Sequence, residues 1–203
     1  MKARVLLSVV LAMLMIGAAS ASGDEVSDAI AAATAAYALG NYKEAGAQLE
    51  VALVGVNRAL SDLITNAMPA PPAGWTVADP RIEASASALG LLAGLVVERT
   101  YTASDGSEIE FTVETNPPQL SGLRMYFSNP KIAAAMGSQD EMKKIKVCGH
   151  DAIEQFTRDS TDIQILAGNV TLISVSGEDS SDRDFVRALA NATDCQAIVS
   201  IIE

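Results

Sequence analysis

Hydrophobic residues recur at spacings of three and four in residues 24–39 and again in residues 42–66. In each segment this spacing brings them onto one face of a helix. The first face holds Val26, Ile30, Ala33 and Tyr37, and the second holds Tyr42, Ala45, Leu49, Ala52, Val56, Leu60 and Leu63. Between the segments, Gly40 favours a helix end and Asn41 favours the cap of the next helix. The pattern therefore predicts an αα-hairpin.

From residue 96 the pattern changes to strict alternation, which is typical of strands. Residues 96–103 and 107–115 alternate on either side of an Asp-Gly pair, a strong signal for a β-hairpin. A three-residue loop, 104–106, keeps the apolar positions of both strands on one face, whereas a two-residue loop does not. We therefore expect the pairs Val97–Val113, Arg99–Phe111 and Tyr101–Ile109.

Four more short strands and several helices complete the pattern. The strands are expected over 145–148, 152–157, 162–167 and 170–176, and the helices over 81–92, 119–127, 130–136 and 182–191. The short turns between these strands favour antiparallel neighbours. The order predicts an α+β fold, in which the N-terminal hairpin precedes an antiparallel sheet of about six strands with helices packed on one face. The layout is similar to that of small exported α+β domains of the PsbP-like class, and this resemblance implies a fold only.

A proline-rich segment separates the N-terminal helical pattern from the strand pattern that follows. Residues 68–80 contain Pro69, Pro71, Pro72 and Pro80, which exclude a helix or a central strand. We expect a hairpin over 22–66, a linker over 67–80 that holds the hairpin away from the sheet, and an α+β domain over 81–203. Trp75 either fastens the linker to this domain or lines a binding cleft.

The first 21 residues have the pattern of a signal peptide. Lys2 and Arg4 precede an apolar run, residues 5–16, and small residues lead up to Ala21, after which we place the cleavage. An uncleaved N-terminal anchor is the alternative. No later apolar run reaches the roughly 18 residues that a membrane helix needs. The sequence thus predicts a periplasmic or secreted protein with no stable membrane insertion after cleavage.

The charge balance narrows the classes of partner. The chain carries 14 basic and 25 acidic residues, and removal of residues 1–21 takes away Lys2 and Arg4. An acidic surface of this kind repels nucleic acid and anionic lipid. Among the remaining residues, Lys143, Lys144 and Lys146 are the one basic cluster, either a solvated strand end or a contact for an acidic partner.

Residues 33–53 resemble a single tetratricopeptide-type helical hairpin. The resemblance is carried by Gly40, Asn41, Tyr42, Ala45, Leu49, Ala52 and Leu53. It departs from that pattern at Ala29, Ala32 and Asn57, and the sequence contains no second copy. Because one such repeat leaves its apolar face partly uncovered, the face is expected to contact the chain's own sheet domain, a second copy or another protein, and the proline-rich linker favours the last two. The residues expected to bind are Tyr42, Leu49, Val56 and Leu60.

One compact polar group, residues 148–151, could carry chemistry. Cys148 with His150 could act as a nucleophile and base, or with Asp151 as part of a metal site that lacks a fourth ligand. An even number of cysteines in an exported protein favours a disulfide between Cys148 and Cys195 instead. The row Glu108, Glu110 and Glu114 could hold calcium, but without a loop of oxygen ligands it is typical of a solvated face.

These observations leave two hypotheses of function. Since the sequence has no phosphate-binding loop, nucleophile elbow or paired zinc motif, we assign no catalytic, cofactor-binding or metal-binding residue. The favoured hypothesis is a non-catalytic exported binding or adaptor protein with the hairpin as its partner-facing element. The alternative is a periplasmic hydrolase that uses His150 or a pair of carboxylates.

Overall fold

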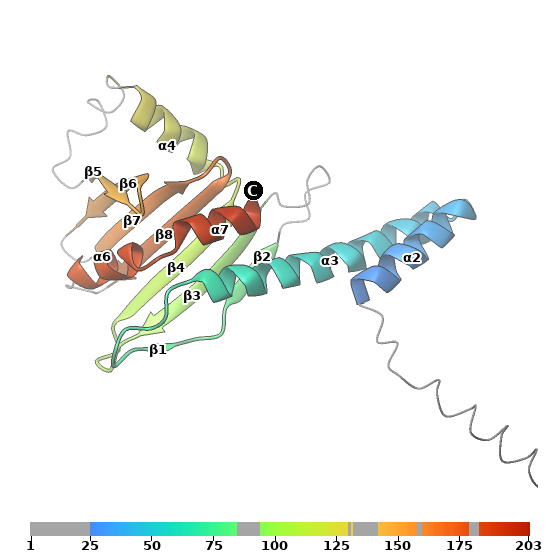
Figure 1. Ribbon diagram of the computed structural model, residues 1–203, viewed down its shortest axis with the longest axis horizontal. Helices are drawn as coiled ribbons and strands as arrows, with labels where there is room; N and C mark the ends of the chain where they lie inside the picture. The colour runs from blue at the N-terminus through green and yellow to red at the C-terminus, as the bar shows by residue number, and fades with distance from the viewer. Residues whose placement is uncertain (1–24, 85–93, 130, 132–141, 158–159, 179–182) are drawn as a thin grey trace, which may run out of the picture. The chain divides into compact units, whose positions relative to one another are not determined.

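The computed structural model describes residues 25–84, 94–129, 131, 142–157, 160–178 and 183–203 of the chain (Figure 1). Its contacts divide the chain into two compact units, residues 1–56 and residues 57–203. We call the described part of the first, residues 25–56, the hairpin unit, and the second the sheet unit. The expected signal peptide, residues 1–21, lies outside the described residues.

The hairpin unit consists of α2 (Glu25–Ala38) and the first part of α3 (Tyr42–Ala67). Gly40 takes a positive φ of 75° at the turn, and the Asn41 side chain accepts a hydrogen bond from the backbone N–H of Glu44, as the sequence predicts. The two helices meet through small residues, because the buried side chains are Ala29, Ala33, Ala45 and Ala52. This close packing leaves the large side chains of both helices outside the contact.

The sheet unit is built on eight antiparallel strands in the order β1-β3-β4-β8-β7-β6-β5, with β2 also paired to β3. The strands are β1 Thr76–Val77, β2 Arg81–Ala84, β3 Leu95–Thr102, β4 Glu108–Thr115, β5 Met142–Val147, β6 His150–Phe156, β7 Ser160–Ala167 and β8 Thr171–Glu178. The helices are α4 Gln119–Ser128, α6 Arg183–Asn191 and α7 Cys195–Ile202, together with the end of α3. The α+β fold is confirmed.

The β3–β4 hairpin has the predicted register. Tyr101 pairs with Ile109, Arg99 with Phe111 and Val97 with Val113. The alternation of the two strands therefore places the side chains of Tyr101, Phe111 and Val113 in the core, where they are fully buried. Gly106 closes the loop with a φ of 89°.

The sheet has more strands than the six expected, because two segments that the sequence predicts as linker and helix form strands. Residues 76–77, expected as linker, form β1, and residues 81–84, expected as the start of a helix, form β2. Both are short and pair with β3, whose backbone offers hydrogen bonds that outweigh the weak helical preference of Arg81–Ala84. Residues 85–92 of that expected helix, and the helix expected over 130–136 apart from Lys131, lie outside the described residues.

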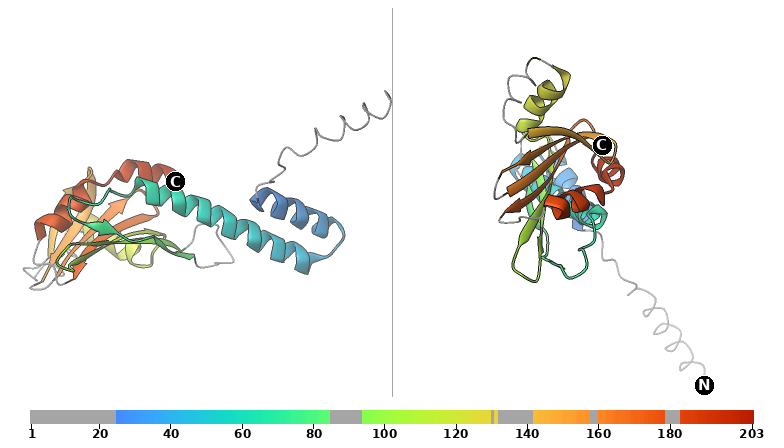
Figure 2. Two further views of the ribbon diagram at one scale, coloured as in Figure 1. Left: turned by 90° about the horizontal axis from the view of Figure 1, so that it is seen from below. Right: turned by 90° about the vertical axis from the view of Figure 1, so that its left-hand side faces the viewer.

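Helices cover both faces of the sheet, whereas the sequence predicted one covered face. The main core lies between the sheet, α6, α7 and the end of α3, and it contains Phe111, Ile163, Ile173 and Ile198. Leu172 alternates with Ile173 and is buried on the opposite face, where α4 packs. Figure 2 shows α6 and α7 along one face and α4 along the other.

The proline-rich segment does not separate the helices from the sheet. Ile64 and Met68, at the end of α3, are buried members of the sheet core. The hydroxyl of Tyr101 donates a 2.7 Å hydrogen bond to the carbonyl of Pro69, and the ring of Trp75 lies 5.2 Å from that of Phe185. Trp75 thus fastens this segment to the sheet, and the division of the chain falls within α3, after residue 56, and not at residues 67–80.

Candidate functional site

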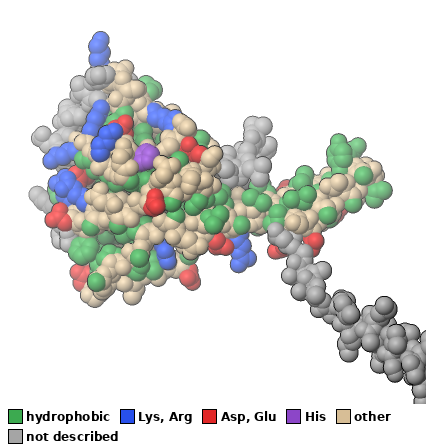
Figure 3. Space-filling model, in the orientation of Figure 1, with side chains coloured by type: hydrophobic (Ala, Val, Ile, Leu, Met, Phe, Trp, Pro, Cys, Tyr) green, Lys and Arg blue, Asp and Glu red, His purple; other side chains and the backbone are tan. Residues whose placement is uncertain are grey.

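Eight large apolar side chains are exposed to solvent in the described part of the hairpin unit; three of them are Leu39, Val51 and Val54, and the other five fall into two rows. The exposed fractions of these five are 49% for Ile30, 67% for Tyr37, 67% for Tyr42, 56% for Leu49 and 36% for Val56. Hydrophobic side chains accordingly lie at the surface of α2 and α3 in Figure 3. We call these five residues the apolar face of the hairpin.

The spacing of these residues explains why they form one face. Ile30 and Tyr37 are seven residues apart on α2, and Tyr42, Leu49 and Val56 follow one another at intervals of seven on α3. Seven residues are close to two helical turns, so each set forms a row along its helix. The rings of Tyr37 and Tyr42 meet edge to face with centroids 5.4 Å apart, which joins the two rows at the turn.

The apolar face carries no charge. Residues 29–42 contain no Asp, Glu, Lys or Arg. On α3, Lys43 and Glu50 directly follow Tyr42 and Leu49 in the sequence, and each therefore points about 100° away round the helix. The described part of the hairpin unit thus presents an uncharged apolar surface to solvent, with its charged side chains elsewhere.

The structure separates the four residues expected to bind a partner. Tyr42, Leu49 and Val56 lie on the apolar face, but Leu60 is half-buried and packs against the core of the sheet unit. Sequence reasoning did not assign Ile30 and Tyr37 to the site, although their spacing of seven matches that of the row on α3.

The cysteines do not provide a nucleophile. Cys148 and Cys195 form a disulfide pair, as predicted, with Cα atoms 6.1 Å apart, and the described residues include no free cysteine. His150 and Asp151 are consecutive residues of β6, so their side chains point to opposite faces of the sheet. Asp151 instead pairs with Lys146 at 2.8 Å. Residues 148–151 therefore do not converge into a catalytic or metal-binding group.

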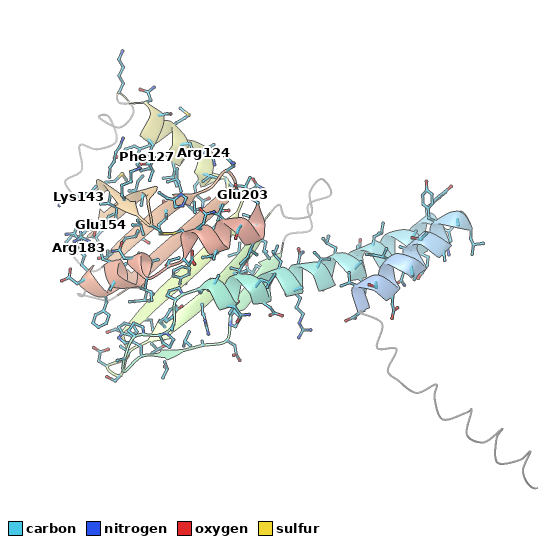
Figure 4. The ribbon with its side chains drawn as sticks, in the orientation of Figure 1. Arg124, Phe127, Lys143, Glu154, Arg183 and Glu203 are labelled. Atoms are coloured by element: carbon cyan, nitrogen blue, oxygen red, sulfur yellow. A yellow bond between two sulfur atoms is a disulfide. The ribbon has the colours of Figure 1, made fainter. Side chains whose placement is uncertain are left out.

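The most buried carboxylate is Glu154 on β6, and the sequence did not single it out. Its side chain is completely buried and accepts hydrogen bonds of 2.6–2.7 Å from both Arg183 and Arg187 of α6 (Figure 4). The hydrogen bonds from Arg183, with those from Arg187 and the positive charge of both, outweigh burial and lower the pKa of Glu154 to about 2. Glu154 is thus ionised at neutral pH and is unsuited to proton transfer there.

The row of glutamates on β4 borders a shallow polar pocket. Glu108 and Glu110, with Thr100 and Ser176, line a shallow pocket of about 170 Å³. Ser176 is engaged by a hydrogen bond to Asp162, and burial raises the pKa of Glu114. Among the described residues, no three His, Cys, Asp or Glu side chains come together as metal ligands.

The lysines of β5 lie on the outermost strand of the sheet. Lys146 pairs with Asp151, and the ammonium group of Lys144 donates a 3.2 Å hydrogen bond to the carbonyl of Tyr126 and lies 4.5 Å from the centre of its ring. Lysines on an edge strand discourage pairing with other strands. The cluster is therefore accounted for by its place in the sheet.

In the parts of the chain that the structure describes, no single helix is long and apolar enough to cross a membrane; α6 and α7 reach that length and hydropathy only together and are bent by 56°. No protein-family model, curated protein or solved structure matches the chain.

Proposed function

We propose that this is an exported, non-catalytic binding or adaptor protein, and that its helical hairpin is the element that contacts the partner. The observation that carries the proposal is the exposed apolar face, formed by Ile30, Tyr37, Tyr42, Leu49 and Val56. Exposed apolar patches of this kind usually mark contact sites, and tyrosines are enriched among the residues that contribute most to binding.

The states of Cys148 and Glu154 support a binding role over a hydrolase that would use either of them. Cys148 is engaged in the disulfide, and Glu154 is ionised and bound by two arginines. The pocket beside Glu108 and Glu110 contains no histidine among the described residues that line it.

Export is the second part of the proposal. It rests on the signal-peptide pattern of residues 1–21 and on the cysteine pair, because disulfides persist in oxidising compartments such as the bacterial periplasm. We place the protein in the periplasm or outside the cell.

The binding role is tested by a pull-down from periplasmic extract with the mature full-length protein as bait. We expect the double substitution Leu49→Asp and Val56→Asp to abolish capture, because it places two charges in the apolar face. The matched control is Val54→Asp, which adds a charge to the same helix at a side chain that is 68% exposed. Residue 54 lies two positions before Val56 and so points about 200° away round the helix.

Capture by the double variant at the level of the unchanged protein would refute the role of this face. Circular dichroism and the melting temperature of the sheet unit establish that both variants are folded. Loss of capture in the Val54→Asp control as well would show an effect of charge on the hairpin in general, and would also count against the proposed face.

A further inference from the structure

We propose that the sheet unit has a binding site of its own, in which Lys143, Arg183 and Arg187 bind a phosphate group. The site lies at the end of the sheet, where two arginines of α6 reach the outer strands β5 and β6. The inference does not rest on the proposed function, because none of these residues belongs to the hairpin unit.

The first argument concerns the hydrogen-bond donors of the two arginines. Both donate to the Glu154 carboxylate through Nε and Nη2. A guanidinium group has five N–H donors, so three remain on each arginine, and these have no partner among the described residues. The side chains of Arg183 and Arg187 are 26% and 39% exposed, whereas Glu154 is completely buried. The remaining donors are therefore accessible from solvent.

The second argument is an excess of positive charge. One bidentate guanidinium is enough to pair a carboxylate, yet Glu154 is bound by two. The second cation adds a cost of desolvation and repels the first. Asp184 attracts Arg183 as well, but more weakly than Glu154 does. An anion bound to the outer edges of both arginines would offset this cost.

Lys143 adds a third cation on the same side of the sheet. It is exposed and stands directly opposite Glu154 in the pairing of β5 with β6. Residues in such positions share a face, with Cβ atoms about 5 Å apart. Lys144 and Lys146 alternate with Lys143 and point to the other face. Figure 4 labels Lys143, Glu154 and Arg183, and Figure 3 shows lysine and arginine side chains gathered at this end of the sheet unit.

The arginines are held in place before any ligand arrives. Glu154 fixes both guanidinium groups through its two oxygens. The guanidinium of Arg183 also lies 4.7 Å from the centre of the Phe156 ring, which restricts its rotation. Groups that are already ordered lose little conformational entropy when they bind, so the arrangement favours binding at the outer edges.

The geometry points to a phosphate group as the ligand. Donors approach from three side chains on two elements, and arginine forks match the oxygens of phosphate. A phosphate monoester offers three peripheral oxygens and up to two negative charges. A carboxylate offers two oxygens in one plane, and the inner edges of the arginines already hold one. The phosphate can belong to a soluble ester or to a lipid headgroup, and the experiment distinguishes these sources.

The test is a titration of the mature full-length protein with glycerol 3-phosphate, followed by NMR at a constant ionic strength of about 0.15 M. We expect saturable shifts of the backbone amide signals of residues 142–147 and 183–187, with a dissociation constant of about 1 mM or below. Acetate at the same ionic strength should bind at least tenfold more weakly.

Lys143→Glu should raise the dissociation constant at least tenfold. The matched control is Lys146→Glu, which makes the same change of charge on the same strand but on the other face, and it should leave the constant within about twofold because salt screens distant charges. Arg187→Lys keeps the charge beside Glu154 and removes the planar fork, so it should also weaken binding. Circular dichroism and the unshifted signals of the other strands establish that each variant is folded.

A flotation assay identifies the source of the phosphate, with phosphatidylcholine vesicles that contain or lack phosphatidic acid. A soluble ligand predicts saturation by glycerol 3-phosphate without flotation. A lipid headgroup predicts flotation with phosphatidic acid alone, abolished by Lys143→Glu and retained by Lys146→Glu.

Three results would overturn the inference. The protein could show neither saturation nor flotation that depends on Lys143, or both lysine variants could weaken binding equally, which would indicate a general effect of charge. Saturation by acetate with the same dissociation constant would show a site for carboxylates and overturn the assignment to phosphate.

Discussion

At the scale of single residues, the pairing of Glu154 with Arg183 and Arg187 joins β6 to α6. The carboxylate has no exposed surface, and four N–H groups saturate its two oxygens. The ring of Phe156 supports one of these cations, since the guanidinium of Arg183 lies 4.7 Å from its centre. Removal of the carboxylate would leave two guanidinium groups close together and without their counter-charge.

This arrangement predicts a pH-dependent contribution to stability. The pKa of Glu154 falls from an ordinary 4.5 to about 2 in the folded protein. A lowered pKa stabilises the folded state above the unfolded value, so the contribution is complete above about pH 4.5 and is lost as the pH falls toward 2. Because Glu154 is completely buried, the contribution is on the order of 3 kcal/mol.

Glu154→Gln should therefore lower the free energy of unfolding by about 3 kcal/mol at pH 7, measured by urea denaturation. The difference from the unchanged protein should shrink between pH 4.5 and pH 2. Asp151→Asn is the control: it breaks the exposed pair with Lys146 and should cost less than about 1 kcal/mol. An equal difference at pH 7 and pH 2.5 would contradict the assignment.

At the scale of elements, sequence patterns were sufficient to predict the helices and strands whose structure depends on nearby residues. The hairpin of α2 and α3 and the register of β3 and β4 could be predicted, because each depends on spacing within one segment and on a turn residue. The helix α7, Cys195–Ile202, was not predicted, because an apolar run of eight residues is too short to be told from a buried strand, although Cys195, Ile198 and Ile202 recur at helical spacing. Its start depends on Asp194, whose side chain accepts a hydrogen bond from the N–H of Ala197.

In the candidate site, too, the residues that follow a local spacing were predictable and those that depend on distant contacts were not. The row Tyr42, Leu49 and Val56 is visible in the sequence because it repeats every seven residues. Leu60 continues the helical pattern but lies in the part of α3 that packs on the sheet, and sequence periodicity does not distinguish a face buried by a domain from one left exposed. The Glu154 group was not predictable, because Arg183 lies 29 residues away along the chain.

The disulfide allows a prediction of how much the link between α7 and the sheet contributes to stability. Cys148 lies in the turn between β5 and β6, and Cys195 begins α7, 47 positions further along the sequence. Closure of a loop of this length is worth roughly 4 kcal/mol in the chain-entropy account. Reduction should therefore lower the melting temperature clearly, as followed by circular dichroism with and without dithiothreitol.

The double variant Cys148→Ser and Cys195→Ala provides the control for this measurement. It should melt at the temperature of the reduced protein and should not respond to the reductant. Two titratable thiols in the purified, oxidised protein would contradict the disulfide.

At the scale of the whole molecule, the proposed export predicts the form in which the protein reaches its compartment. The apolar run behind Lys2 and Arg4 and the small residues before Ser22 predict cleavage after Ala21. Intact-mass measurement of protein from the periplasm or the medium should give a chain that begins at Ser22. A chain that retains Met1 and sediments with membranes would refute the prediction.

The order of the strands decides when the sheet can form. β4 and β8 are neighbours at its centre, yet Glu108 pairs with Glu178 and Thr115 with Thr171, so the pairing joins parts of the chain that are far apart in sequence. If the protein is exported as proposed, with its N-terminus first, β3 and β4 are complete long before β8 emerges. The centre of the sheet therefore closes only after nearly the whole chain has been translocated, and contacts of such separation form slowly.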